Sequence, residues 1–575
     1  MGLDRGAWRV RRDIDWRSPS IWFVMVMVLL SLVAGIGMRD PSPPDEPRFV
    51  LAAQQMVESG EWLLPHRGTE FYAEKPAVFM WLQAAAYTLL RDWRVAFLLP
   101  SLLAAMATLV LVWDLARRLW TRRIAWYAAG ALFVCLQFGL QAKRGQIDMV
   151  LVGLTTLSLW ALLRHLLIAP SSRLLWLGFF AAGVGTVTKG VGFLPLLAIV
   201  PWLATRLCTF ERPDGAALLR WSIAALAFIA GTAVWLAPLA IARMAGPDTE
   251  LDAYIHELLF KQTVQRYSNA WHHVQPWWYY AQSIATVWLP GALLLPWLAA
   301  PWIRRIRRGD ARVVVLLGWA ALVLVFFSIS PGKREVYIFP ALPAMCLVAA
   351  PLLPGLLRRR GVRWALYAWM GLIAFAAVAA SVLAFGGWSV WAERLSTQRA
   401  IAPAEMRDLL LWLLGFGVVG IALLIAAGRL GPARTLVLFT CALWVTYGFG
   451  LAPAVDGAAS ARVLMAQVAT RIGPRAELGM VAWREQNLLQ AQGRVVDFGF
   501  KQPWDVQWAR ASAWVSEQPR TRWLFVLDDA MSQCVDRSQV VPIGASNRRS
   551  WSLVPGSALR PGCVTVGSQA QADGE

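Results

Sequence analysis

Long apolar segments, separated by short loops rich in arginine, dominate this chain of 575 residues. Hydrophobic residues make up 58% of it and charged residues only 16%, a balance that is typical of a protein whose main solvent is the bilayer. The arginines lie in alternate loops, at 9–12, 117–123, 164–173, 206–220, 304–308, 358–363 and 429–434. This is the positive-inside pattern, so the formal charge of +20 indicates cytoplasmic loops rather than nucleic-acid binding.

About thirteen segments are apolar over roughly the 20 residues that a membrane-spanning helix needs. They are 20–38, 95–113, 124–140, 147–167, 174–189, 190–206, 218–243, 278–302, 312–330, 336–357, 363–386, 408–428 and 433–454. The first lacks a clear cleavage pattern, so a retained helix is favoured over a signal peptide. The short run 77–90 is left out, because one more crossing would move every later arginine cluster outside; we expect it along the outer surface.

The character of the chain changes near residue 455, after which no spanning run occurs. We expect a polytopic α-helical membrane domain over 1–454, with outer loops 39–94 and 244–277, and a small extracytoplasmic α/β domain over 455–575. The amino end would be cytoplasmic and the terminal domain outside. Cys534 and Cys563 both lie in that domain, where a disulfide is chemically allowed, although the sequence does not give their separation.

The carboxylates and lysines that could take part in chemistry fall in the opposite, outer loops. The candidates for a functional site are Asp45, Glu46, Arg48, Glu74, Lys75, Arg144, Asp148, Arg266, Lys333, Arg334 and Tyr337. Each has a structural explanation as well: Asp45 and Asp148 could cap helices, and Lys75 could extend to the membrane interface. Together they gather carboxylates and cations on one membrane face. That arrangement suits a substrate with an anionic headgroup and a lipid tail, and a transfer reaction with phosphate as leaving group.

Several of these candidates lie in recognisable stretches of sequence. The stretches are DEPRF at 45–49, ESGEWLLP at 58–65, YAEKP at 72–76, RGQID at 144–148, TKG at 188–190, VQRY at 264–267, HVQPWWYY at 273–280 and GKREVYIFP at 332–340. In this order and spacing the chain resembles the lipid-carrier-dependent glycosyltransferases of the GT-C type. It looks most like the bacterial aminoarabinose transferase and protein mannosyltransferase-like superfamily.

The resemblance implies a sugar donor linked to a polyprenyl phosphate, with undecaprenyl phosphate in a bacterial inner membrane as the expected carrier. It implies inverting transfer to a periplasmic acceptor, with lipid A as the leading candidate. By position, Asp45 and Asp148, with Glu46 beside them, would be the catalytic acids. The carrier phosphate would be held by Lys75, Arg266 and Lys333, and the substrate also by Arg48, Glu74, Arg144, Arg334 and Tyr337. A lipid-linked glycan polymerase or ligase, or a lipid or sugar transporter, is the alternative.

The chain departs from the family pattern at two positions. Ala77 stands where a second proline often follows Glu-Lys-Pro, and Thr263 stands where the aminoarabinose enzymes have a metal-binding histidine. We therefore assign no cofactor from the sequence and leave a divalent metal open.

Overall fold

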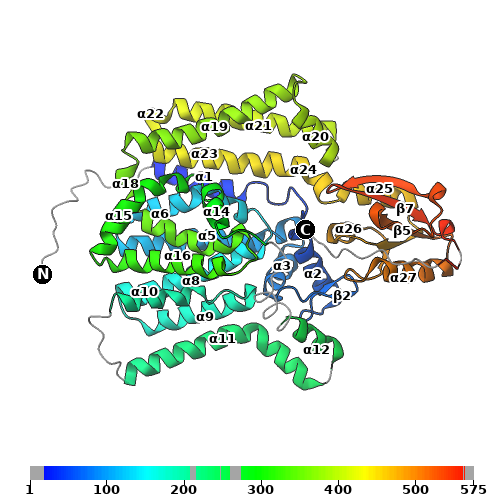
Figure 1. Cartoon of the computed structure of the whole chain (residues 1–575), viewed down its shortest axis with the longest axis horizontal. Coiled ribbons are helices and arrows are strands. Elements are labelled where there is room, and N and C mark those ends of the chain that lie inside the picture. The colour runs from blue at the N-terminus through cyan, green and yellow to red at the C-terminus, as the bar shows by residue number, and fades with distance from the viewer. Residues whose placement is uncertain are drawn as a thin grey trace.

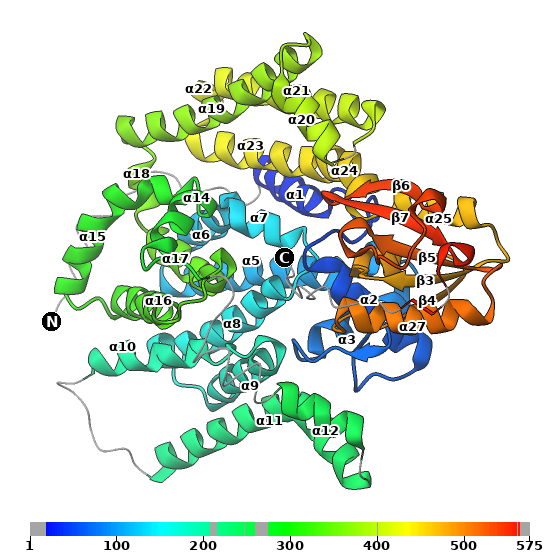
Figure 2. The same ribbon diagram turned by 45° about the vertical axis from the view of Figure 1, so that its right-hand side comes forward.

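The structure is a computed structural model that describes residues 19–206, 215–246, 248–258, 274–399, 401–560 and 562–563. Helices form an extended body, and a mixed sheet with its helices forms a domain at one end, at the right of Figure 1. The first loop, with α2 and α3, lies against that sheet domain, as the turned view of Figure 2 also shows.

Seven helical stretches in the described ranges are long and apolar enough to cross a membrane. Their main helices are α5 (Leu99–Leu119), α8 (Ile147–Leu163), α11 (Gly215–Ala245), α16 (Ala311–Ile329), α19 (Arg360–Phe385), α21 (Pro403–Ile425) and α23 (Pro432–Thr446). Each overlaps one span expected from the sequence. The chain is therefore a polytopic helical membrane protein.

Two expected spans, 124–140 and 278–302, are broken in the middle. α6 (Arg122–Val134) and α7 (Leu136–Ala142) meet at 71°, because Cys135 between them is extended. α14 (Tyr279–Val287) meets the helical stretch that ends with α15 (Leu295–Arg307) at 105°. Pro290 lies in that second break and has no N–H with which to continue a helix.

The other four expected spans form shorter or less apolar helices. They are α1 (Pro19–Val33), α9 (Ser172–Lys189), α10 (Ile199–Ala204) with the 3-10 turn before it, and α17 (Leu342–Ala349), which follows the 3-10 helix η5 (Glu335–Ala341). The count of thirteen crossings stays a prediction.

Small residues allow close helix contacts inside the body. A Cβ atom on Gly183 of α9 would lie 2.3 Å from the carbonyl oxygen of Phe228, and one on Gly231 of α11 would lie 2.3 Å from that of Phe180. The two backbones touch because neither glycine carries a side chain, which is a common way to pack membrane helices.

The loop that follows α1 contains two packed helices. α2 (Glu46–Ser59) buries a stripe that includes Phe49, Ala52, Ala53 and Met56, and it ends at Gly60, whose φ is +77°. The run 77–90 forms α3 (Val78–Leu90), a helix of 13 residues that is shorter than a bilayer crossing requires. Phe79 of α3 packs edge-on against Phe49 of α2, with ring centroids 5.2 Å apart. Between the two helices, β1 (His66–Arg67) and β2 (Glu70–Phe71) form a small hairpin.

The terminal domain is α/β, as expected. Its sheet has the order β4-β3-β5-β7-β6, with strands β3 (Glu477–Val481), β4 (Arg494–Asp497), β5 (Arg522–Leu527), β6 (Val541–Ser546) and β7 (Arg549–Pro555). β3 runs parallel to β4 and β5, whereas β7 is antiparallel to β5 and β6. The helices of this region are α25 (Arg462–Ile472), α26 (Glu485–Leu489) and α27 (Trp504–Glu517). The expected boundary at 455 falls inside α24 (Ala452–Ala459), which continues the helical run of α23.

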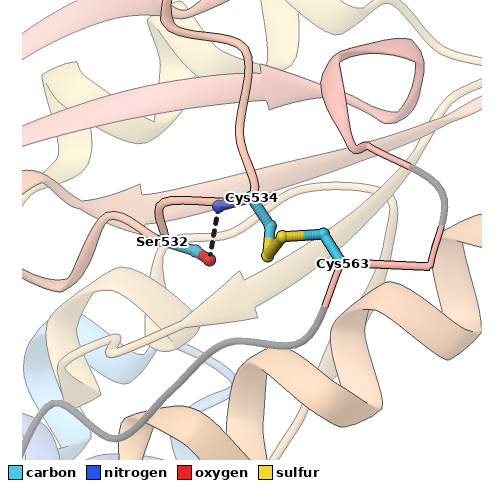
Figure 3. The surroundings of a disulfide bond; sticks show 3 residues. All are labelled: Ser532, Cys534 and Cys563. Atoms are coloured by element: carbon cyan, nitrogen blue, oxygen red, sulfur yellow. Dashed lines mark hydrogen bonds between the residues drawn. A yellow bond between two sulfur atoms is a disulfide. The ribbon is translucent and has the colours of Figure 1, made fainter.

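A disulfide joins Cys534 to Cys563 in this domain, with the two Cα atoms 5.6 Å apart (Figure 3). The backbone N–H of Cys534 also donates to Oγ of Ser532 at 3.0 Å. The pairing that the sequence left open is thus present in the structure.

Candidate functional site

Asp45 lies buried at the start of α2, and its carboxylate faces two distant segments of the chain. It occupies the N-cap position, yet its side chain caps no backbone N–H of the helix. Instead Nε2 of Gln146 donates to Oδ2 of Asp45 at 2.8 Å, and Nη2 of Arg334 lies 3.3 Å from the same oxygen. Nη2 of Arg48 is 3.7 Å from Oδ1. Helix capping therefore does not explain this acid.

Asp148, in the first turn of α8, is buried and forms an ion pair with Lys189, the last residue of α9. The ammonium of Lys189 lies 5.5 Å from the centroid of the Tyr337 ring. It is therefore placed between a carboxylate and an aromatic face, both of which stabilise a cation. Asp148 also interacts favourably with the helix dipole of α8. That interaction alone does not explain why a lysine from another helix pairs with Asp148.

Two short segments bring these acids close to one another. Gln146 contacts Asp45 and lies two residues before Asp148, so the Cα atoms of 146 and 148 are within about 7 Å. Arg334 contacts Asp45 and lies three residues before Tyr337, which contacts Lys189. The segments 146–148 and 334–337 thus each touch both acid clusters, and the two outer elements that the sequence singled out form one site.

Arg48 extends the site toward the Glu-Lys-Pro stretch. Its Nη1 lies 3.5 Å from Oε2 of Glu74, while its Nη2 faces Asp45. Oε1 of Glu74 lies 3.1 Å from Nη2 of Arg67. Burial opposes ionisation of Glu74, but the surrounding cations, Arg67 and Arg48 foremost, outweigh burial and hold the pKa of Glu74 below its usual range. Glu74 is therefore a charged residue that fixes arginines in place.

Arg67 joins this loop to the terminal domain. It is 3% exposed. Its Nη1 donates to Oε1 of Glu485 at 3.1 Å, and its guanidinium carbon lies 3.8 Å from the centroid of the Phe500 ring. The ring of Tyr72, on the other neighbouring segment, is 5.3 Å away. The guanidinium is thus held by two carboxylates and two rings from both parts of the chain.

Three further cations expected at the site, Lys333, Arg144 and Lys75, differ in their surroundings. Lys333 is 4% exposed, and its Nζ contacts the carbonyl oxygens of Gln275 at 3.2 Å and Pro331 at 3.5 Å. Within the described ranges it meets no carboxylate. Arg144 is half-buried and forms neither an ion pair nor a side-chain hydrogen bond with a described residue, and Lys75 is half-buried beside Glu74. A buried ammonium such as that of Lys333, which meets no carboxylate among the described residues, is suited to an anionic ligand.

Glu46 has a different environment from Asp45. Arg39 binds it in a bidentate pair at 2.5 and 2.7 Å, and the backbone N–H groups of Gly145 and Ser42 donate to it at 2.8 and 2.9 Å. Nη2 of Arg39 also donates to the carbonyl oxygen of Lys143 at 2.9 Å. Glu46 thus ties α2 to the segment that carries Gln146, and we interpret it as a residue that positions this segment.

Sequence reasoning missed three residues of this site. Gln146 lies inside the RGQID stretch, but a neutral amide gave no charge signal. Lys189 lies in the TKG stretch, but a lysine at the end of an apolar span gives no functional signal of its own. Arg67 lies in no stretch that was singled out, and only its burial and contacts identify it. Arg266 lies outside the described residues, as do the histidines at 272 and 273.

The surroundings of Glu74 do not fit a divalent metal. Its two oxygens face Arg67 and Arg48, which are cations. Among the described residues there is no group of three or more His, Cys, Asp and Glu side chains that could hold a metal ion. Thr263, the position aligned with the family's histidine, lies outside the described part of the chain. We therefore derive no chemical step through a metal.

Comparisons with known proteins agree with this architecture. The family model described as dolichyl-phosphate-mannose-protein mannosyltransferase matches residues 74–237. The undecaprenyl phosphate-alpha-4-amino-4-deoxy-L-arabinose arabinosyl transferase of Pseudomonas aeruginosa is 32% identical over 320 residues, which are 53% of this chain and 54% of that protein. A transferase of the same name from Sodalis glossinidius is 28% identical over 424 residues, 69% of this chain and 70% of that protein. The chain thus spans about half the length of the first of these relatives.

Solved structures extend the likeness to nearly the whole chain. ArnT from Cupriavidus metallidurans bound to undecaprenyl phosphate has a TM-score of 0.73 and 19% identity, covering 95% of this chain and 100% of that one. The apo state of the same protein gives a TM-score of 0.71 with 20% identity. At these identities the likeness shows a shared fold, which includes both the helical body and the sheet domain.

Proposed function

We propose that the chain is a membrane glycosyltransferase related to the GT-C type aminoarabinose transferases. It takes a sugar from a polyprenyl-phosphate donor, with undecaprenyl phosphate as the expected carrier, and passes it to an acceptor on the periplasmic face of a bacterial inner membrane. Lipid A is the leading acceptor. The names of the relatives and the shared fold support the donor class.

One structural observation carries the proposal: buried acids and cations meet where the segments 146–148 and 334–337 touch. The acids are Asp45 and Asp148. Lys333 adds a buried ammonium that contacts only carbonyl oxygens among the described residues. A reaction that releases a lipid phosphate needs this combination, because negative charge develops on the phosphate as the glycosidic bond breaks.

The residues divide the work as follows. Lys75, Lys333 and Arg266 hold the donor phosphate and stabilise the charge that grows on it. Asp45 faces the acceptor and orients or deprotonates its nucleophilic oxygen, while Arg334 and Gln146 fix the carboxylate. The oxygen attacks the anomeric carbon from the face opposite the leaving phosphate, which inverts the configuration. The phosphate departs with the electron pair of the broken bond.

Asp148 keeps Lys189 in place, and Lys189 in turn lies over Tyr337. We assign this trio to positioning the segment 334–337, whose first residue contacts Asp45. Arg48 lies between the carboxylates of Asp45 and Glu74, and Arg144 adds a further cation two residues before Gln146.

The test is transfer of a labelled sugar from a polyprenyl-phosphate donor by purified protein, with lipid A, a glycan and a peptide as separate acceptors. We expect Asp45→Asn to lower turnover by at least about a hundredfold, in the range of the 10²–10⁴-fold that positioned acid or base groups contribute. Glu393→Gln, an exposed acid of α20 (Val390–Arg399), is the matched control and should keep full activity.

Each outcome distinguishes the alternatives. Near-normal turnover of Asp45→Asn and Asp148→Asn would reject the mechanism. Movement of the labelled lipid across vesicles without product would favour a transporter, and repeated addition to a lipid-linked glycan would favour a polymerase or ligase.

A further inference from the structure

A large apolar cavity lies within the helical body, separate from the candidate site. Its volume is about 1440 Å³. That exceeds the roughly 300–1,000 Å³ of ordinary small-molecule pockets. α1, α5, α6, α15, α17, α19 and α23 contribute to its walls, whereas Asp45, Asp148, Lys75 and Lys333 do not. Its size and apolar lining fit hydrocarbon chains.

Arginines gather along this cavity without acidic partners. The cavity is lined by Arg122, Arg123, Arg358, Arg363 and Arg434, and no Asp or Glu is among its lining residues. None of the five forms an ion pair with a described residue. The nearby acids are already engaged, since Asp114 pairs with Arg117 and Arg118, and Asp310 pairs with Arg305 and Arg312.

Two buried donors in the cavity wall have no hydrogen-bond partner among the described residues. They are Nε of Arg123, on α6, and Nε1 of Trp113, on α5. An unsatisfied buried donor destabilises the folded protein, because the donor loses its bond to water and gains none in return. A ligand oxygen at this place would remove that destabilisation, so the polar end of an occupant belongs beside Arg123.

The arginines lie at the end of the body remote from the candidate site. Ser101, near the start of α5, bonds to the carbonyl oxygen of Gln146, which places that end of α5 beside Asp45. Arg122 follows the other end of this 21-residue helix. A helix of that length spans about 30 Å, the thickness of a bilayer core. In Figure 1, α18 (Leu353–Leu356) and α22 (Ala427–Leu430), whose neighbours supply Arg358 and Arg434, lie at the left, away from the sheet domain.

We propose that this cavity binds an anionic glycerophospholipid of the membrane leaflet opposite the candidate site. The acyl chains fill the apolar space between α1, α6 and α19, and the phosphate accepts hydrogen bonds from Arg123 and its arginine neighbours. Charge complementarity identifies the occupant, because a neutral lipid would leave the arginines uncompensated. The positive-inside pattern explains why arginines occur on this side, but it does not require them to surround a cavity.

The test measures lipid retained by the purified protein after exchange in detergent micelles with equal amounts of phosphatidylglycerol and phosphatidylcholine, by extraction and mass spectrometry. The cavity variant is Arg122→Gln/Arg123→Gln/Arg434→Gln. The matched control is Arg304→Gln/Arg307→Gln/Arg308→Gln, which removes the same charge from exposed arginines of the α15 end that do not line the cavity.

We expect wild type and control to retain phosphatidylglycerol in preference to phosphatidylcholine. The preference of the cavity variant for phosphatidylglycerol should be at least about tenfold smaller, since each cation at an anionic lipid surface raises the affinity roughly fivefold. Gly130→Phe provides an independent variant. Gly130 lines the cavity and a Cβ there meets nothing within 4 Å, so the ring fills space meant for an acyl chain and should lower retention as well.

Three results would overturn the proposal. One is equal retention of the two lipids by wild type. Another is an equal loss in the cavity and control variants, which would mean general surface attraction. The third is displacement of phosphatidylglycerol by stoichiometric undecaprenyl phosphate, which would make the cavity the compartment of a polyprenyl chain.

Discussion

Replacing Arg67 by methionine should undock the first outer loop from the terminal domain. Methionine has a long apolar side chain without a charge. The rings of Tyr72 and Phe500 therefore still have a side chain to pack against, while Glu74 and Glu485 lose the positive charge of Arg67. Glu485 has a side chain only 10% exposed, and it would then be a buried carboxylate without this cation.

The size of the effect follows from the two ion pairs. Removing one partner of a buried pair costs about 3–5 kcal/mol. The lower end, about 3 kcal/mol, applies because Glu74 keeps Arg48 and its side chain is 29% exposed. The matched control is Arg494→Met, whose side chain is 86% exposed where it pairs with Glu477. An exposed pair contributes about 0–1 kcal/mol, so this variant should behave as wild type.

Thermal unfolding in detergent and hydrogen exchange of residues 66–75 provide the readouts. We expect Arg67→Met to lower the melting temperature by several degrees and to raise exchange in that segment, while Arg494→Met changes neither. A double-mutant cycle with Glu485→Gln should show coupling above about 0.5 kcal/mol. A melting temperature and exchange pattern equal to those of wild type would refute the reasoning.

Three further expectations concern other contacts. The pKa of Glu74 is held below its usual range. The ionised carboxylate therefore stabilises the fold fully above the pKa of an unfolded carboxyl, and this stabilisation is lost as the pH falls through the lowered pKa. The melting temperature of wild type should accordingly fall more steeply with acid than that of Glu74→Gln. A Cβ at Gly192 would lie 1.9 Å from the backbone of α9, so Gly192→Ala should cost about 1–3 kcal/mol or more, whereas Gly215→Ala, with nothing within 4 Å, should not; equal melting temperatures would contradict this. Cys534→Ser should lower the stability of the terminal domain by about 2–4 kcal/mol and free the thiol of Cys563 for alkylation; full labelling of that thiol in unreduced wild type would show that the bond does not form.

The sequence predicted the architecture well where one physical signal was strong. Apolar runs bounded by arginines located the long helices. The same signal could not show that the chain bends at Cys135 and at Pro290, because composition averages over a break of one or two residues. The number of crossings depends on whether each broken pair of helices forms one span, and hydropathy alone does not decide this.

The candidate site was predictable in its charges but not in its pairings. Asp45 and Asp148 stood out as acids beside spans, yet nothing in their order along the chain indicates that Gln146 and Arg334 connect them. A lysine at the end of a span is common, so only the ion pair of Lys189 with Asp148 shows that it belongs to the site. Both Asp45 and Glu46 are buried, but their partners differ: Arg39 forms a bidentate pair with Glu46, whereas Gln146 and Arg334 contact Asp45.

The hairpin of β1 and β2 is bound to the terminal domain through its own backbone and side chains. Thr69 donates to both oxygens of Asp497, at 2.9 and 3.0 Å, and Glu70 accepts from the N–H of Lys501 and from Gln502 at 2.8 and 2.9 Å. A chimera that exchanges residues 455–575 for those of a relative would leave these partners facing foreign side chains. The hairpin therefore has to be exchanged together with the terminal domain. By its contacts, residues 66–71 belong to that domain, although they lie far from it in the sequence.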